Sequence, residues 1–193
     1  MGKLFVLMGK SSTGKDTIYK ELLKSDKLNL KEAVIYTTRP IRAGEVNGRE
    51  YYFVDEKTRD ELANSGKVIE RRDYNTVHGV WSYFTVDDGQ FDLDNRDYLV
   101  IATLEAYKEF IRFFGKNKVK PIYINVEDGV RLTRALEREK AQTEPKYAEL
   151  CRRFLADSAD FSEDKLKEAG IDMVFENASL EACLAEIVSY VLS

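Results

Sequence analysis

The stretch Gly9-Lys10-Ser11-Ser12-Thr13-Gly14-Lys15-Asp16-Thr17 decides the fold of this 193-residue chain. Residues 3–8 before it form an apolar run of strand length, and residues 18–23 after it are typical of a helix. The two glycines allow a tight turn that aims successive backbone N–H groups into the loop, and the helix adds the positive end of its dipole. Strand, glycine-rich loop and helix in this order predict a phosphate-binding loop, with Lys15 against the outer phosphates.

The residue after Lys15 departs from the usual pattern of such loops. A serine or threonine normally stands there and offers a hydroxyl to Mg²⁺, but this chain has Asp16, with Thr17 behind it. A carboxylate can also ligate Mg²⁺, although polyphosphate repels its charge unless the metal or Lys15 neutralises it. Thr17 points about 100° further around the helix and is a poor substitute. We expect Asp16 to be the metal ligand, and phosphate contacts from Gly9, Ser11, Ser12, Thr13, Gly14, Lys15, Asp16 and Thr17.

The composition is that of a globular chain, with 44% hydrophobic and 33% charged residues. The net charge of −4 gives no argument for a nucleic-acid polymer as a partner. Cys151 and Cys183 stand far apart and form no CxxC pair, so we expect reduced thiols in the cytoplasm and no zinc site. No apolar run approaches the ~20 residues needed to cross a membrane. The strand-like N-terminus predicts that no signal peptide precedes the fold.

Helical and strand-like segments alternate along most of the chain. We expect core strands at residues 32–37, 97–103, 118–126 and 171–175. The expected helices lie at 104–114, at 127–140, after Pro145, and from the cap Ser179 to Leu192. Short strands at 50–54, 68–71 and 76–86, a turn at His78 and Gly79, and a helix capped by Asp55 indicate an inserted β-rich subdomain. The alternation predicts an α/β fold with a parallel sheet flanked by helices, whose ligands bind at the carboxyl ends of the strands.

A second segment carries a more specific signal than the loop. It reads Thr37-Thr38-Arg39-Pro40-Ile41-Arg42-Ala43-Gly44-Glu45-Val46-Asn47-Gly48-Arg49-Glu50-Tyr51-Tyr52-Phe53. Almost residue for residue, it resembles the loop that binds the nucleoside monophosphate in the guanylate kinase family. The resemblance runs the length of the chain and fades between Arg71 and Leu104.

The resemblance implies a Mg²⁺-dependent kinase that transfers a phosphoryl group from ATP to GMP, giving ADP and GDP. The loop around Lys15 would then be the ATP site. The resemblance also implies a P-loop kinase core at residues 1–32, 88–130 and 156–193. Residues 33–87 would be the subdomain that binds the monophosphate, and residues 131–155 would be a helical lid.

The resemblance also assigns the residues around the acceptor phosphate. Arg39, Arg42 and Tyr51 match the residues that hold the phosphate of GMP. This chemistry is sound, because guanidinium groups bind phosphate oxygens in pairs and tyrosine adds a neutral donor. The segment Tyr83-Phe84-Thr85 is similar to the family's Tyr-Gly-Ser/Thr, which implies that Tyr83 lies near the phosphate.

Two further residues are implied to read the base. Glu70 matches the carboxylate that accepts from N1–H and N2–H₂ of guanine, a pair of donors that adenine does not offer on that edge. Thr85 would lie near the base as well. Ile35 departs from the family, which usually has a serine there that contacts the base, and an isoleucine cannot donate to guanine O6.

The basic helices near residue 140 resemble the family's lid. Arg134 and Arg138 lie one helical turn apart on one face, and Arg153 follows from the next helix. Such arginines close over ATP and stabilise charge on the transferring phosphoryl group, so Lys15, Arg134, Arg138 and Arg153 are the candidate catalytic residues. Arg131 is a candidate fourth member. The alternative is a solvated surface on which these arginines pair with Glu137, Glu139, Glu144 and Glu149.

The strand at residues 97–103 lacks the acidic residues that the family has near its end. Ile101 and Thr103 occupy those positions, and Glu105 is the nearest carboxylate. One hypothesis is that Asp16 takes over the metal-orienting charge that this strand has lost.

Two other functions remain open at this point. One is a related small-molecule kinase, such as ribose 1,5-bisphosphate phosphokinase, whose family also has Gly-Lys-Asp in its phosphate loop. The other is a guanylate-kinase-like binding module without catalysis. In such modules the phosphate loop is usually degraded, whereas Lys15 is intact here. For a kinase the partners are the small molecules ATP and GMP, without a nucleic-acid polymer or a membrane, and the protein is expected to be a monomer or homodimer.

Overall fold

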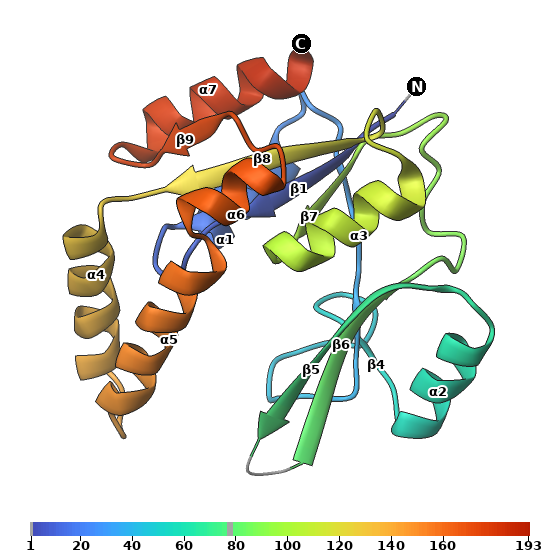
Figure 1. Cartoon of the computed structure of the whole chain (residues 1–193), viewed down its shortest axis with the longest axis horizontal. Helices are drawn as coiled ribbons and strands as arrows, with labels where there is room; N and C mark the ends of the chain where they lie inside the picture. Colours follow the sequence, from blue (N-terminus) through green and yellow to red (C-terminus); the bar gives the residue numbers. More distant parts are fainter. Residues whose placement is uncertain (1, 77–78) are drawn as a thin grey trace.

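The computed structural model of the chain describes residues 2–76 and 79–193. Its larger sheet has the strand order β2-β7-β1-β8-β9, and all neighbouring strands are parallel (Figure 1). These strands are β1 (Leu4–Met8), β2 (Lys31–Glu32), β7 (Tyr98–Ile101), β8 (Val119–Asn125) and β9 (Val174–Glu176). The order confirms the expected parallel sheet, and the central strand β1 leads directly into the glycine-rich loop.

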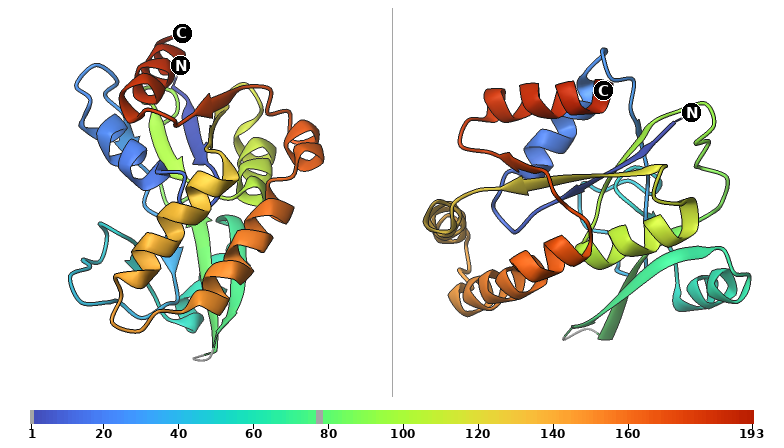
Figure 2. Two further views of the ribbon diagram at one scale, coloured as in Figure 1. Left: turned by 90° about the vertical axis from the view of Figure 1, so that its left-hand side faces the viewer. Right: turned by 45° about the horizontal axis from the view of Figure 1, so that its top comes forward.

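Strand β1 shows how the sheet is buried on both faces. Its residues are all buried, and successive side chains point to opposite faces. Leu4 and Val6 belong to the apolar cluster that includes α3 (Leu104–Phe114), whereas Phe5 and Leu7 belong to the cluster with α1 (Lys15–Lys24) and α7 (Leu180–Leu192). Figure 2 shows these helices on the two sides of the sheet. Burial on both faces explains why the strand sequence is apolar throughout and does not alternate.

A smaller sheet is formed by the segment between β2 and β7. Its order is β4-β3-β6-β5, with β3 (Tyr36–Thr37), β4 (Tyr52–Phe53), β5 (Val68–Thr76) and β6 (Gly79–Val86). Strands β5 and β6 form a long antiparallel pair. Helix α2 (Glu56–Asn64) begins after Asp55, whose carboxylate accepts from the Thr58 N–H as expected of an N-cap. The β-rich insertion is therefore present where the sequence predicts it.

Two helices extend from the carboxyl end of β8, on the side of the molecule away from α2 (Figure 1). They are α4 (Asp128–Lys140) and α5 (Tyr147–Asp160), and the short α6 (Glu163–Glu168) connects α5 to β9. The guanidinium carbon of Arg131 in α4 lies 4.7 Å from the ring centre of Phe154 in α5, which fixes the two helices against each other. No helix among the described residues is both long and apolar enough for a membrane span.

Several expected element bounds are wrong. The expected strand 32–37 is divided between the two sheets, because the Ala33 N–H donates to Leu99 in the larger sheet while the Ile35 carbonyl accepts from Tyr52 in the smaller one. The strand expected at 50–54 is limited to β4, the strand expected at 171–175 begins only at Val174, and α6 was not expected. The expected turn at His78 lies outside the described residues.

Candidate functional site

The glycine-rich loop between β1 and α1 is held in place by Asn177, a residue far from it in the sequence. Gly14 is the N-cap of α1 with φ 84°, and a Cβ there would lie 2.7 Å from Nδ2 of Asn177. The same Nδ2 donates to the Thr13 carbonyl at 2.8 Å, and the Thr13 hydroxyl donates to the Lys10 carbonyl at 2.9 Å. Asn177 is buried and follows β9, so the end of the sheet fixes the loop from outside. Only glycine fits at position 14 without strain.

Lys15 begins α1 and lines two neighbouring cavities of about 410 and 780 Å³. Burial is the main cause that lowers its pKa from the ordinary lysine value, and the charges of Arg153 and Arg138 act in the same direction. The charges of Asp16 and Asp157 oppose this shift. Two carboxylates and two guanidinium groups therefore surround the lysine, which is the charge pattern of a site for polyanions with a metal.

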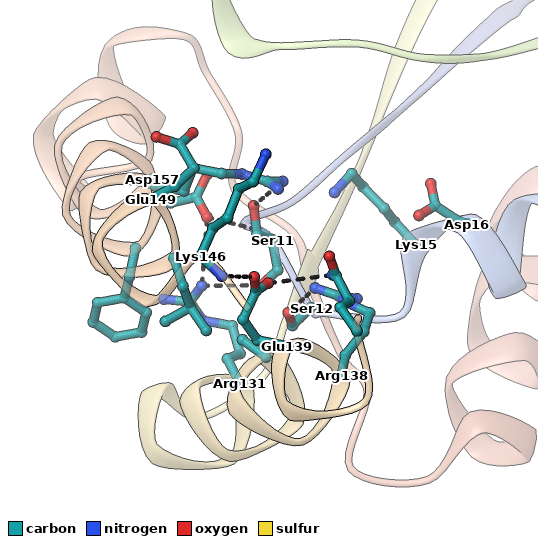
Figure 3. A pocket seen from close by; sticks show the side chains of 15 residues that line it. Ser11, Ser12, Lys15, Asp16, Arg131, Arg138, Glu139, Lys146, Glu149 and Asp157 are labelled. Carbon is teal, nitrogen blue, oxygen red and sulfur yellow. Dashed lines mark hydrogen bonds and ion pairs between the residues drawn. The ribbon is translucent and has the colours of Figure 1, made fainter. Parts of the chain in front are cut away.

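Ser11 is the point at which both long helices meet the loop (Figure 3). Its backbone N–H donates to Oδ2 of Asp157 at 2.7 Å, and its carbonyl accepts from Nη1 of Arg131 at 3.1 Å. Its hydroxyl accepts from Nη2 of Arg153 at 3.2 Å, and the neighbouring Ser12 hydroxyl accepts from Nη2 of Arg138 at 2.9 Å. The arginines of α4 and α5 thus reach the loop itself.

Arg131 has a different role from the other lid arginines. Its side chain is 1% exposed, and it bonds through Nε and Nη2 to Oδ1 of Asp128 and lies 3.7 Å from Asp157. Lys10 also reaches Asp128 at 3.5 Å. These bonds hold the pKa of Asp128 below its usual range. Because its guanidinium is held in this buried network, Arg131 anchors the helices to the loop. Its place as a fourth phosphate-facing arginine stays a prediction.

Arg134 and Arg138 line a further cavity of about 320 Å³ beside the loop, together with Thr17 and Asn177. Among the described residues, no salt bridge joins Arg131, Arg134, Arg138 or Arg153 to the glutamates of the alternative interpretation, which are Glu137, Glu139, Glu144 and Glu149. Glu149 pairs with Arg152 at 2.7 Å, not with Arg153. The contacts of Arg138 and Arg153 to loop hydroxyls favour the phosphate-binding interpretation over a solvated surface.

On the acceptor side, Arg39 is buried and held by its own loop. Its two terminal nitrogens donate to Glu45 at 3.0 and 2.8 Å, and its guanidinium lies 5.4 Å from the ring centre of Tyr51. The hydrogen bond to Glu45 is the main cause that raises the pKa of Arg39, and the same bond lowers the pKa of Glu45. Arg42 is exposed, and its backbone N–H also donates to Glu45 at 2.8 Å. The loop therefore gathers two cations around one carboxylate.

The expected base-reading pair is adjacent across the β5–β6 ladder. Glu70 and Thr85 are register partners, and the Thr85 hydroxyl donates to Oε1 of Glu70 at 2.7 Å. Glu70 is buried and also accepts from Arg72, at 3.0 Å from Nε and 3.3 Å from Nη2. Arg72 in turn faces Tyr83 across the ladder.

The 780 Å³ cavity brings the two sides together. It is lined by loop residues including Lys15 and Asp16, and by Tyr51, Arg72 and Tyr83 of the smaller-sheet segment. The strand-end residues Ile101 and Thr103 and the position of Ile35 line it as well. Within the described residues, the lining does not include Arg39, Arg42, Glu70 or Thr85.

No cluster of three or more His, Cys, Asp or Glu side chains suited to a metal occurs in the two described ranges. Asp16 is nevertheless beside Lys15 and lines both larger cavities. Mg²⁺ in kinase sites typically takes one or two carboxylates and completes its shell with water and phosphate oxygens. The donor set therefore fits a metal that arrives with its nucleotide, not one held in a cage of protein ligands.

Sequence reasoning missed three residues of this site, namely Arg72, Asp157 and Asn177, and it did not foresee the buried contacts of Arg131. For Arg72 a signal existed, because it stands two residues from Glu70 on a strand and must share its face. Asp157 stands four residues after Arg153 on α5, so the helical repeat could have placed it near the loop. Nothing local marks Asn177.

Comparisons with known proteins agree with this geometry. The Guanylate kinase family model matches residues 1–193. The guanylate kinase of Homo sapiens is 32% identical over 186 residues, which cover 94% of this chain and 88% of that protein. The match to guanylate kinase of Lactiplantibacillus plantarum is 41% over 73 residues, or 38% of this chain and 35% of that one.

A solved structure shares the fold. The crystal structure of guanylate kinase from Anaplasma phagocytophilum covers 99% of this chain, with 85% of its own length matched, a TM-score of 0.66 and 23% sequence identity. Since the family model spans the whole chain and a relative of 32% identity aligns over nearly its full length, the chain belongs to the guanylate kinase family, whose members are nucleoside monophosphate kinases.

Proposed function

We propose that this protein is a guanylate kinase, which transfers the γ-phosphoryl group of ATP to GMP and releases ADP and GDP. The observation that carries the proposal is the 780 Å³ cavity, because it joins the phosphate loop at Lys15 to the acceptor face at Tyr51 and Tyr83. A kinase of this kind needs no covalent intermediate. It aligns donor and acceptor, excludes water, and neutralises charge.

On the donor side we assign ATP to the loop residues Gly9, Ser11, Ser12, Thr13, Gly14, Lys15, Asp16 and Thr17. Lys15 would hold the outer phosphates, supported by its place between both cavities. Arg138 and Arg153 would stabilise charge on the moving phosphoryl group, supported by their contacts with Ser12 and Ser11, and Arg134 would join them from α4. When bound with ATP, Mg²⁺ supplies charge neutralisation across the phosphates. Asp16 would be its protein ligand.

On the acceptor side we assign the GMP phosphate to Arg39, Arg42, Tyr51 and Tyr83, and guanine to Glu70 and Thr85. The stacking of Arg39 on Tyr51 and the buried bond between Thr85 and Glu70 support this division. Both terminal nitrogens of Arg39 already donate to Glu45, so the phosphate would have to replace Glu45 in at least one of these hydrogen bonds. Arg42 lies on the same loop and is open to solvent.

The functional division of the chain is part of the same proposal. Residues 131–155 would close as a lid, residues 33–87 would carry GMP, and the remaining residues would hold ATP. The contacts of Arg138 and Arg153 with the loop hydroxyls support α4 and α5 as the helices that approach ATP. We further propose that the protein acts in the cytoplasm as a monomer or homodimer.

One observation favours a second candidate function. Glu70 is engaged by Arg72, which adds a cation to the acceptor face and suits a more anionic acceptor such as a sugar bisphosphate. The non-catalytic alternative is opposed by the intact Lys15 and by the lid arginines that reach the loop.

The test is ADP release from MgATP with GMP, dGMP, AMP, UMP or ribose 1,5-bisphosphate as the offered acceptor. We expect turnover with GMP and not with AMP. We expect Glu70→Gln to lose most of this preference, because an amide has one acceptor oxygen where a carboxylate has two, and its NH₂ group would face a guanine donor. Turnover with the sugar phosphate alone would favour the second candidate. GMP binding without turnover would favour the binding module.

A further inference from the structure

The guanidinium of Arg72 donates hydrogen bonds to the carboxylate of Glu70, the residue assigned to guanine recognition. Its Nε reaches Oε2 of Glu70 at 3.0 Å, and its Nη2 reaches Oε1 at 3.3 Å. The Glu70 side chain is 1% exposed and that of Arg72 is 19% exposed. With the Thr85 hydroxyl on Oε1 as well, both carboxylate oxygens are engaged by protein donors.

Arg72 and guanine offer this carboxylate the same chemical edge. Guanine presents N1–H and N2–H₂ on a single N–C–N fragment, and a guanidinium presents Nε–H and Nη–H on another. Two such forks cannot occupy the same two oxygens. Guanine that binds Glu70 therefore displaces Arg72, and it replaces the hydrogen bonds but not the positive charge. A displaced, half-buried cation needs another anionic partner.

The strand geometry places such a partner within the reach of Arg72. Glu70, Arg72 and Tyr74 alternate along β5 and therefore share one face, with Arg72 opposite Tyr83 in the β6 register. Arg72 lines the 780 Å³ cavity together with Tyr51 and Tyr83, the residues assigned to the acceptor phosphate. The positive charge of Arg72 also acts on the hydroxyl of Tyr51 and partly offsets the rise in its pKa caused by burial. Arg72 thus stands between the base-reading and phosphate-binding residues.

We propose that Arg72 is a specificity-determining residue that couples recognition of the base to recognition of the phosphate: guanine takes Glu70 from Arg72, and the released guanidinium pairs with the phosphate of the same acceptor. The proposal rests on the proposed function. Guanosine lacks the phosphate and leaves Arg72 without a partner, so it binds disproportionately weakly. AMP brings a phosphate but lacks the paired donors, so Arg72 stays on Glu70.

The experiment is calorimetric titration of GMP and of guanosine into the wild-type protein and into Arg72→Met, which keeps the aliphatic stem. In Arg72→Met we expect guanosine to bind more tightly, because its competitor for Glu70 is gone. We expect the ratio of the guanosine Kd to the GMP Kd to fall about tenfold or more, the size of a lost charge-assisted hydrogen bond to phosphate. The ratio isolates the phosphate contact, because removal of the competitor affects both ligands alike.

Arg71→Met is the matched control. Arg71 neighbours Arg72 but bonds to Asp73, with its Nε 2.9 Å from Oδ1, and strand alternation puts it on the other face. Its guanosine-to-GMP ratio should equal that of the wild type. Arg72→Lys serves as a second variant, because lysine keeps the charge but cannot form the fork with Glu70. Guanosine should again bind more tightly, with a smaller fall in the ratio.

The outcomes separate the two proposals. If wild-type protein binds GMP but neither Arg72 variant changes the ratio, the coupling is overturned and the proposed function stands. If guanosine binding does not tighten in either variant, the competition for Glu70 is overturned. If wild-type protein does not bind GMP at all, the proposed function fails and this inference fails with it.

Discussion

The donor and acceptor sides of the cavity are held together in different ways. On the donor side, Ser11 is contacted by Arg131, Asp157 and Arg153 from 120, 146 and 142 residues away. On the acceptor side, two of the residues assigned to GMP are held by residues close to them in the sequence. Arg39 pairs with Glu45 six residues on, and Glu70 pairs with Arg72 two residues on.

This difference means that the ATP side is preorganised, whereas residues on the GMP side must exchange protein partners for ligand. The donor loop is shaped by long-range contacts that leave Lys15 facing the cavities, so its geometry exists before chemistry begins. On the acceptor side, the residues assigned to GMP are paired with protein groups that resemble the ligand. Arg39 is paired with the carboxylate of Glu45, an anion like phosphate, and Glu70 is paired with the guanidinium of Arg72, a double donor like guanine. Recognition there requires partner exchange, so its free energy is a difference between two good pairings.

The largest expected effect comes from a substitution that disables the ATP side and leaves the GMP side intact. Lys15→Met removes the half-buried cation from the phosphate site, and kcat should fall about 10³-fold, as for loss of a preorganised charge-stabilising group. GMP affinity measured by calorimetry should not change, because Lys15 belongs to the donor loop. Lys20→Met, exposed on the same helix, is the control for both measurements. A parallel loss of GMP affinity would show that the two sides are not independent.

The next effect tests whether the donor side depends on its buried network. Arg131→Met should lower the free energy of unfolding by about 3 kcal/mol, because it leaves Asp157 and the Ser11 carbonyl without the buried guanidinium. Arg152→Met breaks an exposed pair with Glu149 and should cost far less, because solvent screens exposed pairs. Urea denaturation measures both. Equal losses would contradict the anchoring role given to Arg131.

A smaller effect sharpens the role of the unusual carboxylate in the loop. Asp16→Ser restores the common motif, yet we expect kcat/KM to fall about tenfold and the Mg²⁺ requirement to rise, as when a group that orients a metal is lost. The reason is that Ile101 and Thr103 supply no carboxylate at the strand end that lines the same cavity. Asp26→Ser, exposed after α1, is the control. Undiminished turnover in Asp16→Ser would contradict this compensation.

The smallest effect concerns pH. Burial lowers the pKa of Lys15 below the ordinary 10.5, so its charge is lost at a lower pH than in an exposed lysine. The profile of kcat/KM, which reports the free enzyme, should therefore fall on the alkaline side before pH 10.5. Because the unfolded chain binds this proton more tightly, the contribution of Lys15 to stability rises with pH across the same window. Lys15→Arg should move the alkaline limb upward, since arginine stays protonated; an unmoved limb would assign it to another group.

The sequence predicts what local chemistry determines. The loop around Lys15 could be located because its glycines, lysine and flanking elements are contiguous, and the helix caps Asp55 and Ser179 were correct for the same reason. The divided strand at 32–37 could not be foreseen. Its residues bond to Leu99 and to Tyr52, and only the tertiary fold decides between these partners.

The candidate site shows the same limit. Arg138 and Arg153 contact hydroxyls of the loop, which agrees with the helical spacing that puts them on the side facing ATP. Arg131 lies on α4 with Arg138, but its guanidinium is buried between Asp128 of the same helix and Asp157 of α5. The spacing along α4 alone does not show that α5 places a carboxylate there. Asn177 is 164 residues from the carbonyl it holds, beyond any local pattern. The assignments of these residues to ATP and GMP stay predictions.

The most direct test of the account offers two acceptors at once. Wild-type protein is given γ-³²P-labelled MgATP with equal concentrations of GMP and ribose 1,5-bisphosphate, and the labelled products are separated by chromatography. The account predicts that the label appears in GDP, because Glu70 and Thr85 read guanine and the phosphate-binding residues place its phosphate toward Lys15. Label in the sugar product, or no transfer to either acceptor, would contradict it.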